Sequence, residues 1–133
     1  MNQASEKAVK NTADIKSMGV QDLHRYAKEL AVEATRSTQR QDLIFAIMKK
    51  LAQSETALNG DGVLEIMQDG YGFLRSPSGS YLAGADDFYV APHLIRKFHL
   101  KSGDTVSGTI RGPEKGERYF SLTSVDQINY EAP

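Results

Sequence analysis

The spacing of apolar residues changes from a helical to a strand period near residue 59 of this 133-residue chain. Before that point, apolar side chains recur every three or four residues, as they do on one face of an amphipathic helix. After it, they alternate with polar side chains at every second position, as in half-buried strands. This change of period predicts an α+β organisation, in which a small helical bundle precedes an all-β unit.

Two apolar stripes predict the main helices of the first part. The first stripe consists of Leu23, Tyr26, Ala27 and Leu30. The second consists of Leu43, Ile44, Ile47, Met48 and Leu51. Thr38 and Gln41 have the spacing of a capping box before the second helix, and Phe45 is expected to face the β unit. Residues 1–18 have few large apolar groups and are expected to form a flexible extension with room for one helical turn, so the predicted helical subdomain is 19–58.

Five short strands are predicted between residues 59 and 133. They fall at 63–68, 71–75, 87–90, 104–111 and 118–125. Asp69-Gly70 is a hairpin signal between the first two strands, and Pro92 opens a short predicted helix between the third and the fourth. This order of elements is typical of a five-stranded OB-fold barrel of the cold-shock type, which is the predicted domain 59–133.

The composition excludes several classes of protein. The chain contains no cysteine, so it has no disulfide framework, thiolate zinc site or cysteine nucleophile. No apolar run approaches the roughly 18 residues of a membrane span, and the first residues lack the apolar stretch of a secretory signal. The three histidines are scattered and no nucleophile elbow is present, so neither a metal site nor a catalytic site is expected. We therefore expect a cytoplasmic protein that has no membrane partner and is not an enzyme.

The charge balance differs between the two parts. Residues 1–58 carry nine Lys and Arg against seven Asp and Glu, whereas residues 59–133 carry seven against ten. Non-specific binding to phosphates relies on a surplus of positive charge. If the barrel binds nucleic acid, the bases must therefore contribute more than the phosphates.

Three strands place aromatic rings on the face opposite their core residues. In DGYGFLRS, residues 69–76, every second side chain projects to one side, and the same alternation applies to DDFYV at 86–90 and ERYFSL at 117–122. The residues predicted on the outer face are Tyr71, Phe73, Arg75, Asp87, Tyr89, Glu117, Tyr119 and Ser121. Exposed rings beside an arginine are suited to stacking on unpaired bases. The alternative is that these rings cover a hydrophobic patch or a partner helix.

The polar groups beside the rings predict a preference for cytosine. Arg75 offers only donors, whereas ionised Asp87 and Glu117 offer only acceptors. Cytosine presents an amine donor next to a carbonyl and a ring nitrogen that accept, so an arginine and a carboxylate together match its edge. Uracil would place a carbonyl against the carboxylate. Single-stranded DNA carries the same base, so these residues are compatible with either nucleic acid.

The chain resembles the N-terminal RNA-binding region of the bacterial transcription termination factor Rho. The similarity is carried by RQDLIFAIMK, GDGVLEIMQDGYGFLRS, YLAGADDFYV, SGDTVSGTIR and GERYF, which occur in the family's order. It implies a helical cap on an OB barrel whose primary site binds single-stranded, cytosine-rich RNA. In that site, Tyr71 and Phe73 would stack on bases and Arg75 and Asp87 would read the cytosine edge. The residues that would complete the site are Met67, Tyr89, Arg111, Lys115, Glu117, Arg118 and Tyr119.

The resemblance also implies a motor that this sequence does not contain. Members of the family continue into a hexameric ATPase that uses ATP and Mg²⁺ and acts on the RNA polymerase elongation machinery. No G-x-x-x-x-G-K-[ST] motif occurs among the 133 residues, so the chain is expected to bind RNA without hydrolysing ATP. Two other functions remain compatible with the residues: a free-standing cold-shock-like RNA chaperone, and a protein-interaction module of the OB type.

Overall fold

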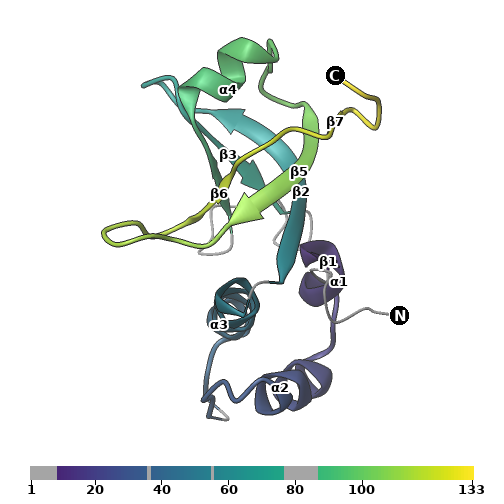
Figure 1. Cartoon of the computed structure of the whole chain (residues 1–133), viewed down its shortest axis with the longest axis vertical. Coiled ribbons are helices and arrows are strands. Elements are labelled where there is room, and N and C mark those ends of the chain that lie inside the picture. The colour runs from purple at the N-terminus through teal and green to yellow at the C-terminus, as the bar shows by residue number, and fades with distance from the viewer. Residues whose placement is uncertain (1–8, 36, 55, 77–86) are drawn as a thin grey trace.

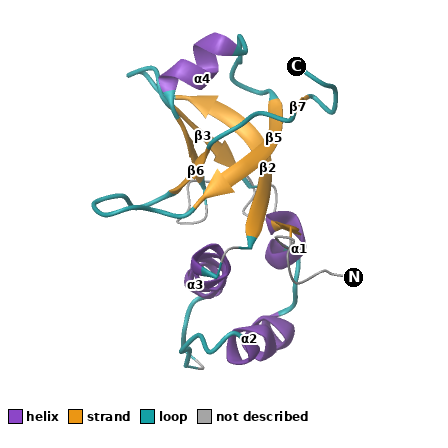
Figure 2. Cartoon of the chain, in the orientation of Figure 1, coloured by secondary structure: helices purple, strands orange, loops and turns teal. Residues whose placement is uncertain are grey.

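The computed structural model describes residues 9–35, 37–54, 56–76 and 87–133. Helices α1 to α3 lie at one end, a closed barrel follows, and helix α4 covers the far end of the barrel (Figures 1 and 2). The helices are α1 (Thr12–Lys16), α2 (Val20–Glu29), α3 (Arg40–Gln53) and α4 (Pro92–Lys97). The strands are β1 (Val9–Asn11), β2 (Ala57–Ile66), β3 (Gly72–Arg75), β4 (Phe88–Val90), β5 (Thr105–Arg111), β6 (Phe120–Leu122) and β7 (Gln127–Ile128). The predicted α+β class with an OB-type barrel is confirmed.

The barrel closes because β2 pairs with two strands. Its second half pairs antiparallel with β3, and most of its length pairs antiparallel with β5. Strand β4 joins β3 to β6 through one antiparallel and one parallel pairing, and β6 returns to β5. The inward-facing side chains along these strands are buried, as the alternation predicts. The core includes Leu58, Leu64, Leu74, Phe88, Val90, Val106, Ile110, Phe120 and Leu122.

Strand β2 begins earlier than the pattern indicates. Residues 59–62, which separate the two periods in the sequence, lie inside the strand and not before it. Gly60 faces the barrel core, where an added Cβ would lie 2.5 Å from the Phe88 ring. Glycine in a strand often marks such a close approach, so here it allows a large ring to fill the core.

The two apolar stripes pack the helices against one another, and α3 also contacts the barrel. The second stripe is buried along α3, and Leu23 and Ala27 of α2 are buried against it. Phe45 of α3 contacts Phe120 of the barrel edge to face, with ring centroids 5.3 Å apart. The prediction that Phe45 faces the barrel is therefore confirmed.

The predicted flexible extension is wrong for residues 9–18. Strand β1 pairs in parallel with the start of β2, and Asn11 caps α1 by accepting a hydrogen bond from the Ala13 N–H at 2.8 Å. Ile15 is buried, and the ammonium of Lys16 lies 4.2 Å from the centre of the Phe88 ring. Strand pairing, the helix cap, the buried Ile15 and the cation on a ring all hold this segment, and a count of apolar residues does not detect most of these contacts. Residues 1–8 lie outside the described part.

The predicted capping box before α3 is also wrong. The N-cap residue is Gln39, and its side chain makes no capping hydrogen bond. The hydroxyl of Thr38 instead accepts a hydrogen bond from the Thr35 N–H at 2.9 Å. Thr38 therefore closes a local turn, an alternative that short polar side chains regularly offer the backbone.

The turn between β2 and β3 is confirmed. The Gly70 N–H donates to the Met67 carbonyl at 2.9 Å, and the Met67 N–H donates to the Tyr71 carbonyl at 2.7 Å. Gly70 has a φ of 98°, which lies in the left-handed region that glycine adopts without strain. This hairpin places Tyr71 directly before β3.

Replacing Gly60 by alanine is expected to lower the free energy of unfolding by about 1–3 kcal/mol, because the added methyl group overpacks the core beside Phe88. Urea unfolding of the variant and the wild type measures the difference. Gly112→Ala is the control, since the nearest atom to its added Cβ lies at an ordinary 3.4 Å. Equal stability of Gly60→Ala and the wild type would contradict the close approach.

Candidate nucleic-acid interface

Four aromatic rings form one continuous surface on the outside of the barrel. Phe73 of β3 lies opposite Tyr89 of β4 in the antiparallel register, and their ring centroids are 6.1 Å apart. Tyr71 is 5.8 Å from Phe73 and 5.7 Å from Tyr89, and Tyr119 is 4.8 Å from Phe73. All four side chains are half-buried. The prediction that they share an outer surface is confirmed, and we call this surface the aromatic path.

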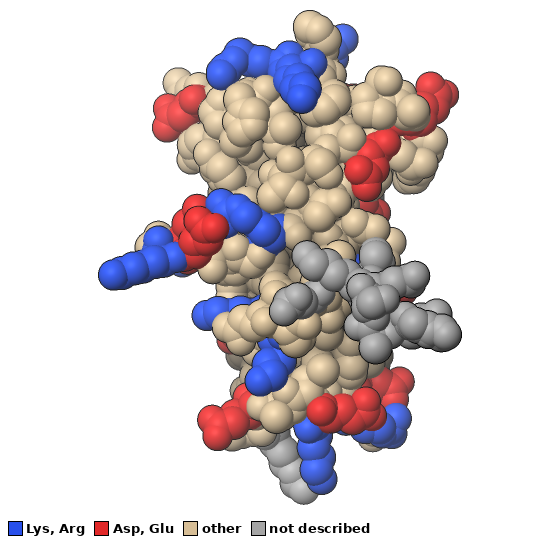
Figure 3. Space-filling view, in the orientation of Figure 1, with Lys and Arg blue, Asp and Glu red and all other residues tan. Residues whose placement is uncertain are grey.

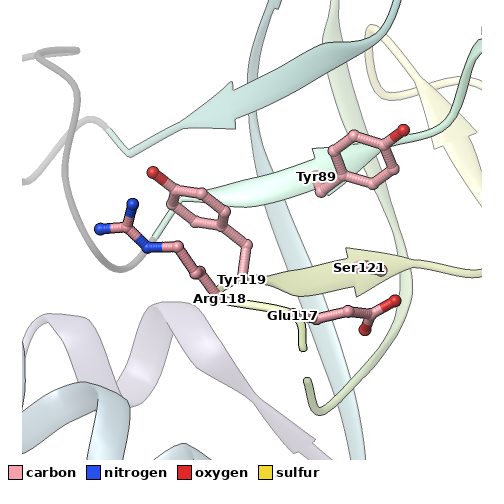
Figure 4. A pocket seen from close by; sticks show the side chains of 5 residues that line it. All are labelled: Tyr89, Glu117, Arg118, Tyr119 and Ser121. Atoms are coloured by element: carbon pink, nitrogen blue, oxygen red, sulfur yellow. The ribbon is translucent and has the colours of Figure 1, made fainter. Parts of the chain in front are cut away.

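A cavity of about 260 Å³ opens at one end of the aromatic path. Its lining residues are Tyr89, Glu117, Arg118, Tyr119 and Ser121. The Tyr89 and Tyr119 rings stand apart on two sides of it (Figure 4); Tyr89 lies on β4, and Tyr119 directly precedes β6. We refer to it as the Tyr89–Tyr119 cavity. A space between two rings is an arrangement into which a flat base can insert.

Arg75 is held from two sides at the edge of the path. Its Nε donates to Glu65 at 3.0 Å, its Nη1 donates to Asp87, and its guanidinium carbon lies 5.1 Å from the Phe73 ring centre. Burial by itself lowers the pKa of Arg75, but the hydrogen bonds to Asp87 and Glu65 outweigh it, so the pKa is raised. These contacts fix the plane of the guanidinium. We call the three residues the Arg75 cluster.

The predicted exposure of Asp87 and Arg75 is wrong. Asp87 is 1% exposed and Arg75 is 9% exposed. Asp87 precedes β4, which begins at Phe88, so the alternation of the strand does not govern its direction. A buried guanidinium requires a carboxylate partner, and this pairing draws both side chains beneath the aromatic path.

Glu117 is fixed by Arg111 at the wall of the Tyr89–Tyr119 cavity. Arg111 donates to the two carboxylate oxygens at 2.8 and 3.1 Å, and the Glu114 N–H donates to the same carboxylate at 3.0 Å. These hydrogen bonds, with that from Arg111 the largest effect, lower the pKa of Glu117 to about 2. Glu117 therefore stays ionised, and its acceptors keep one orientation.

The remaining predicted residues lie at the margins of the site. Met67 is half-buried in the turn that carries Tyr71, and Arg118 is an exposed lining residue of the Tyr89–Tyr119 cavity. Lys115 is exposed in the loop between β5 and β6. Arg111, which the resemblance places near the RNA backbone, is paired with Glu117. Their contacts with RNA remain predictions.

The sequence reasoning left out Glu65 and did not include Ser121 among the site residues. Glu65 lies opposite Phe73 in the β2–β3 register. The predicted hairpin at Asp69-Gly70 implies this pairing, so the position of Glu65 beside the rings could have been predicted. Ser121 was predicted on the outer face, but nothing in the sequence indicates that it lines a cavity. The pairing of the strands therefore determines the positions of both residues at the site.

Two further kinds of feature are absent from the described residues: a metal-binding cluster and a membrane-spanning helix. Within the described ranges, no three His, Asp or Glu side chains are grouped closely enough to hold a metal ion. In the same ranges, no helix has the length and apolar character required to cross a membrane.

The fold and the site define a class of protein. An OB-type barrel with a continuous aromatic path beside an arginine is typical of domains that bind single-stranded nucleic acid. Residues 60–133 match the family model described as Rho termination factor, RNA-binding domain, and residues 14–56 match Rho termination factor, N-terminal domain. The chain belongs to the Rho termination factor family, and its barrel is the RNA-binding domain.

Similar proteins of known identity come from several bacteria. The chain is 50% identical over 123 residues to transcription termination factor Rho of Pseudomonas fluorescens biotype C, and 49% identical to that of Escherichia coli strain K12. It is 50% identical to the same factor of Salmonella typhimurium. Each match covers 92% of this chain and 29% of the relative's length. The resemblance is confirmed, and the chain spans less than a third of the length of these relatives.

Removing the Arg111 guanidinium by Arg111→Gln is expected to raise the pKa of the Glu117 carboxyl from about 2 toward its ordinary value of 4.5. The wild-type pKa lies below the unfolded value, so the pair stabilises the fold above about pH 4.5 and this stability is lost as the pH falls through 2. A carboxyl-carbon NMR titration of both proteins measures the two midpoints. A wild-type midpoint near 4.5 would contradict the pairing.

Proposed function

We propose that the aromatic path binds single-stranded, cytosine-rich RNA and serves as the primary RNA-loading site of a transcription termination factor. The observation that supports this most strongly is the contact of four partly exposed rings with one another beside the Arg75 cluster. Each ring offers a surface for one unstacked base, and stacking is worth about 1–3 kcal/mol per base. Paired bases in a duplex do not expose these faces, so single strands are selected.

The Arg75 cluster supplies the proposed selectivity for cytosine. Its guanidinium offers donors, and the carboxylates of Glu65 and Asp87 offer acceptors within one small area. The cytosine edge has both a donor and acceptors, so it matches such a mixed cluster. Uracil lacks the amine, and its carbonyl would lie against a carboxylate of the protein. In this proposal, the main role of buried Asp87 is to orient Arg75 toward the bound base.

The charge distribution agrees with base binding more than with phosphate binding. In Figure 3 the Lys and Arg side chains form separate groups, and Asp and Glu side chains lie beside several of them. Arg75 and Arg111, two of the arginines next to the rings, are each paired with carboxylates. Few positive charges are left to neutralise phosphates along the path, so the salt dependence of binding should be shallow.

The remaining length of the similar proteins is expected to contain the motor domain. The similar proteins are described as transcription termination factors, and the chain spans 29% of their length. ATP and Mg²⁺ do not fit this chain, because its 133 residues contain no phosphate-binding G-x-x-x-x-G-K-[ST] motif. We assign both to a motor domain of the full-length protein, together with hexamer formation, contact with RNA polymerase and a cytoplasmic location.

Titration of labelled oligo-C, oligo-U, oligo-A and duplex RNA at two salt concentrations tests the proposal. Oligo-C is expected to bind most tightly and duplex RNA not to bind, because the duplex hides both the faces and the edges that the site uses. Phe73→Ala is expected to weaken oligo-C binding by about 1–3 kcal/mol, since it removes one stacking surface.

The matched control is Tyr130→Ala, which removes a ring that is 77% exposed and lies outside the aromatic path. Its affinity for oligo-C should equal that of the wild type. Equal affinity of the wild type for all four nucleic acids would refute the cytosine preference. An unchanged affinity of Phe73→Ala would remove the aromatic path from the binding site.

A further inference from the structure

Ser121 does not point into the barrel core, and groups on the outer surface of the barrel cover its side chain. Three consecutive residues of β6 are buried, although strand side chains alternate between two faces. Phe120 and Leu122 belong to the barrel core, so Ser121 points outward. It is nevertheless only 8% exposed. The groups that cover it must therefore belong to the outer surface.

Those groups are the walls of the Tyr89–Tyr119 cavity. Tyr89 is the partner of Ser121 in the β4–β6 pairing, and Arg111 is its partner in the β5–β6 pairing. Tyr119 precedes Ser121 by two residues and lines the same cavity. Since Arg111 holds Glu117 at the wall, Ser121 lies at the floor between the two tyrosines and the carboxylate, as Figure 4 shows for the lining side chains.

The hydroxyl of Ser121 is available to a ligand. Within the described residues, its Oγ takes part in no hydrogen bond with another part of the protein. A hydroxyl has one donor and two acceptor lone pairs, and a polar group recessed in a cavity needs a partner from water or from a ligand. A base that entered the cavity would displace that water, so the ligand must replace the lost hydrogen bond.

We propose that the Ser121 hydroxyl forms a hydrogen bond with the edge of a pyrimidine base inserted between Tyr89 and Tyr119. This inference rests on the proposed function and adds to it a polar contact at the floor of the cavity. Because a hydroxyl both donates and accepts, it pairs with the amine edge of cytosine and with the carbonyl edge of uracil. Ser121 therefore contributes affinity for both pyrimidines, whereas the Arg75 cluster distinguishes between them.

Substitution Ser121→Ala removes the hydroxyl and keeps the space. The dissociation constants for oligo-C and oligo-U are each expected to rise about 3- to 10-fold, with the ratio between them unchanged. The measurement is a fluorescence titration of the 133-residue chain with each oligonucleotide. Thermal unfolding of the same samples checks that the variant is folded.

Ser107→Ala is the matched control, because Ser107 is also an outward-facing serine in a barrel strand but lies outside the cavity. It should bind both oligonucleotides as the wild type does. If the wild type binds oligo-C and Ser121→Ala binds it equally well, this inference is wrong and the proposed function stands. A loss confined to one of the two oligonucleotides would refute the shared contact. A wild type that binds neither would overturn both proposals.

Discussion

The packing of the Phe88 ring in the barrel core links the start of the chain to the strand that carries the nucleic-acid interface. Gly60 of β2 leaves room for the ring, and Lys16 places its ammonium over the ring from the helical part. The residues on either side of Phe88 belong to the nucleic-acid interface: Asp87 holds Arg75, and Tyr89 lies on the aromatic path. One buried side chain thus determines where strand β4 runs, and with it the position of the selective groups. The helical segment contributes to this arrangement and is more than a separate cap.

Carboxylates hold two of the guanidinium groups close to the rings. Arg75 pairs with Asp87 and Glu65, and Arg111 pairs with Glu117 and, at 3.9 Å, with Glu114. Arginine paired in this way keeps a fixed geometry and loses much of its attraction for phosphate. Binding through stacking and base edges, as we propose, agrees with this pairing and with the excess of acidic residues in the second part of the chain.

Periodicity alone predicted the parts of the fold in which one face is apolar. The stripes of α2 and α3, the alternation of β2 to β6 and the aromatic path all follow from residue spacing, because burial of one face imposes a period on the sequence. The same reasoning failed where a few polar contacts decide the structure. The start of the chain is held by the Asn11 cap, by Ile15 and by Lys16, and the burial of Asp87 follows from its pairing with Arg75. Such contacts depend on single residues, some of them distant in the sequence, and leave no periodic signal.

The central claim is that bases stack on the rings of the outer barrel surface. A crystal structure of the chain bound to a short oligo-C is the most direct test. Our account predicts one base between Tyr89 and Tyr119, a second base on Phe73 with its edge toward Arg75, and few contacts to phosphate. An oligonucleotide bound along the helices α1 to α3, or held through its phosphates with the four rings uncovered, would contradict it.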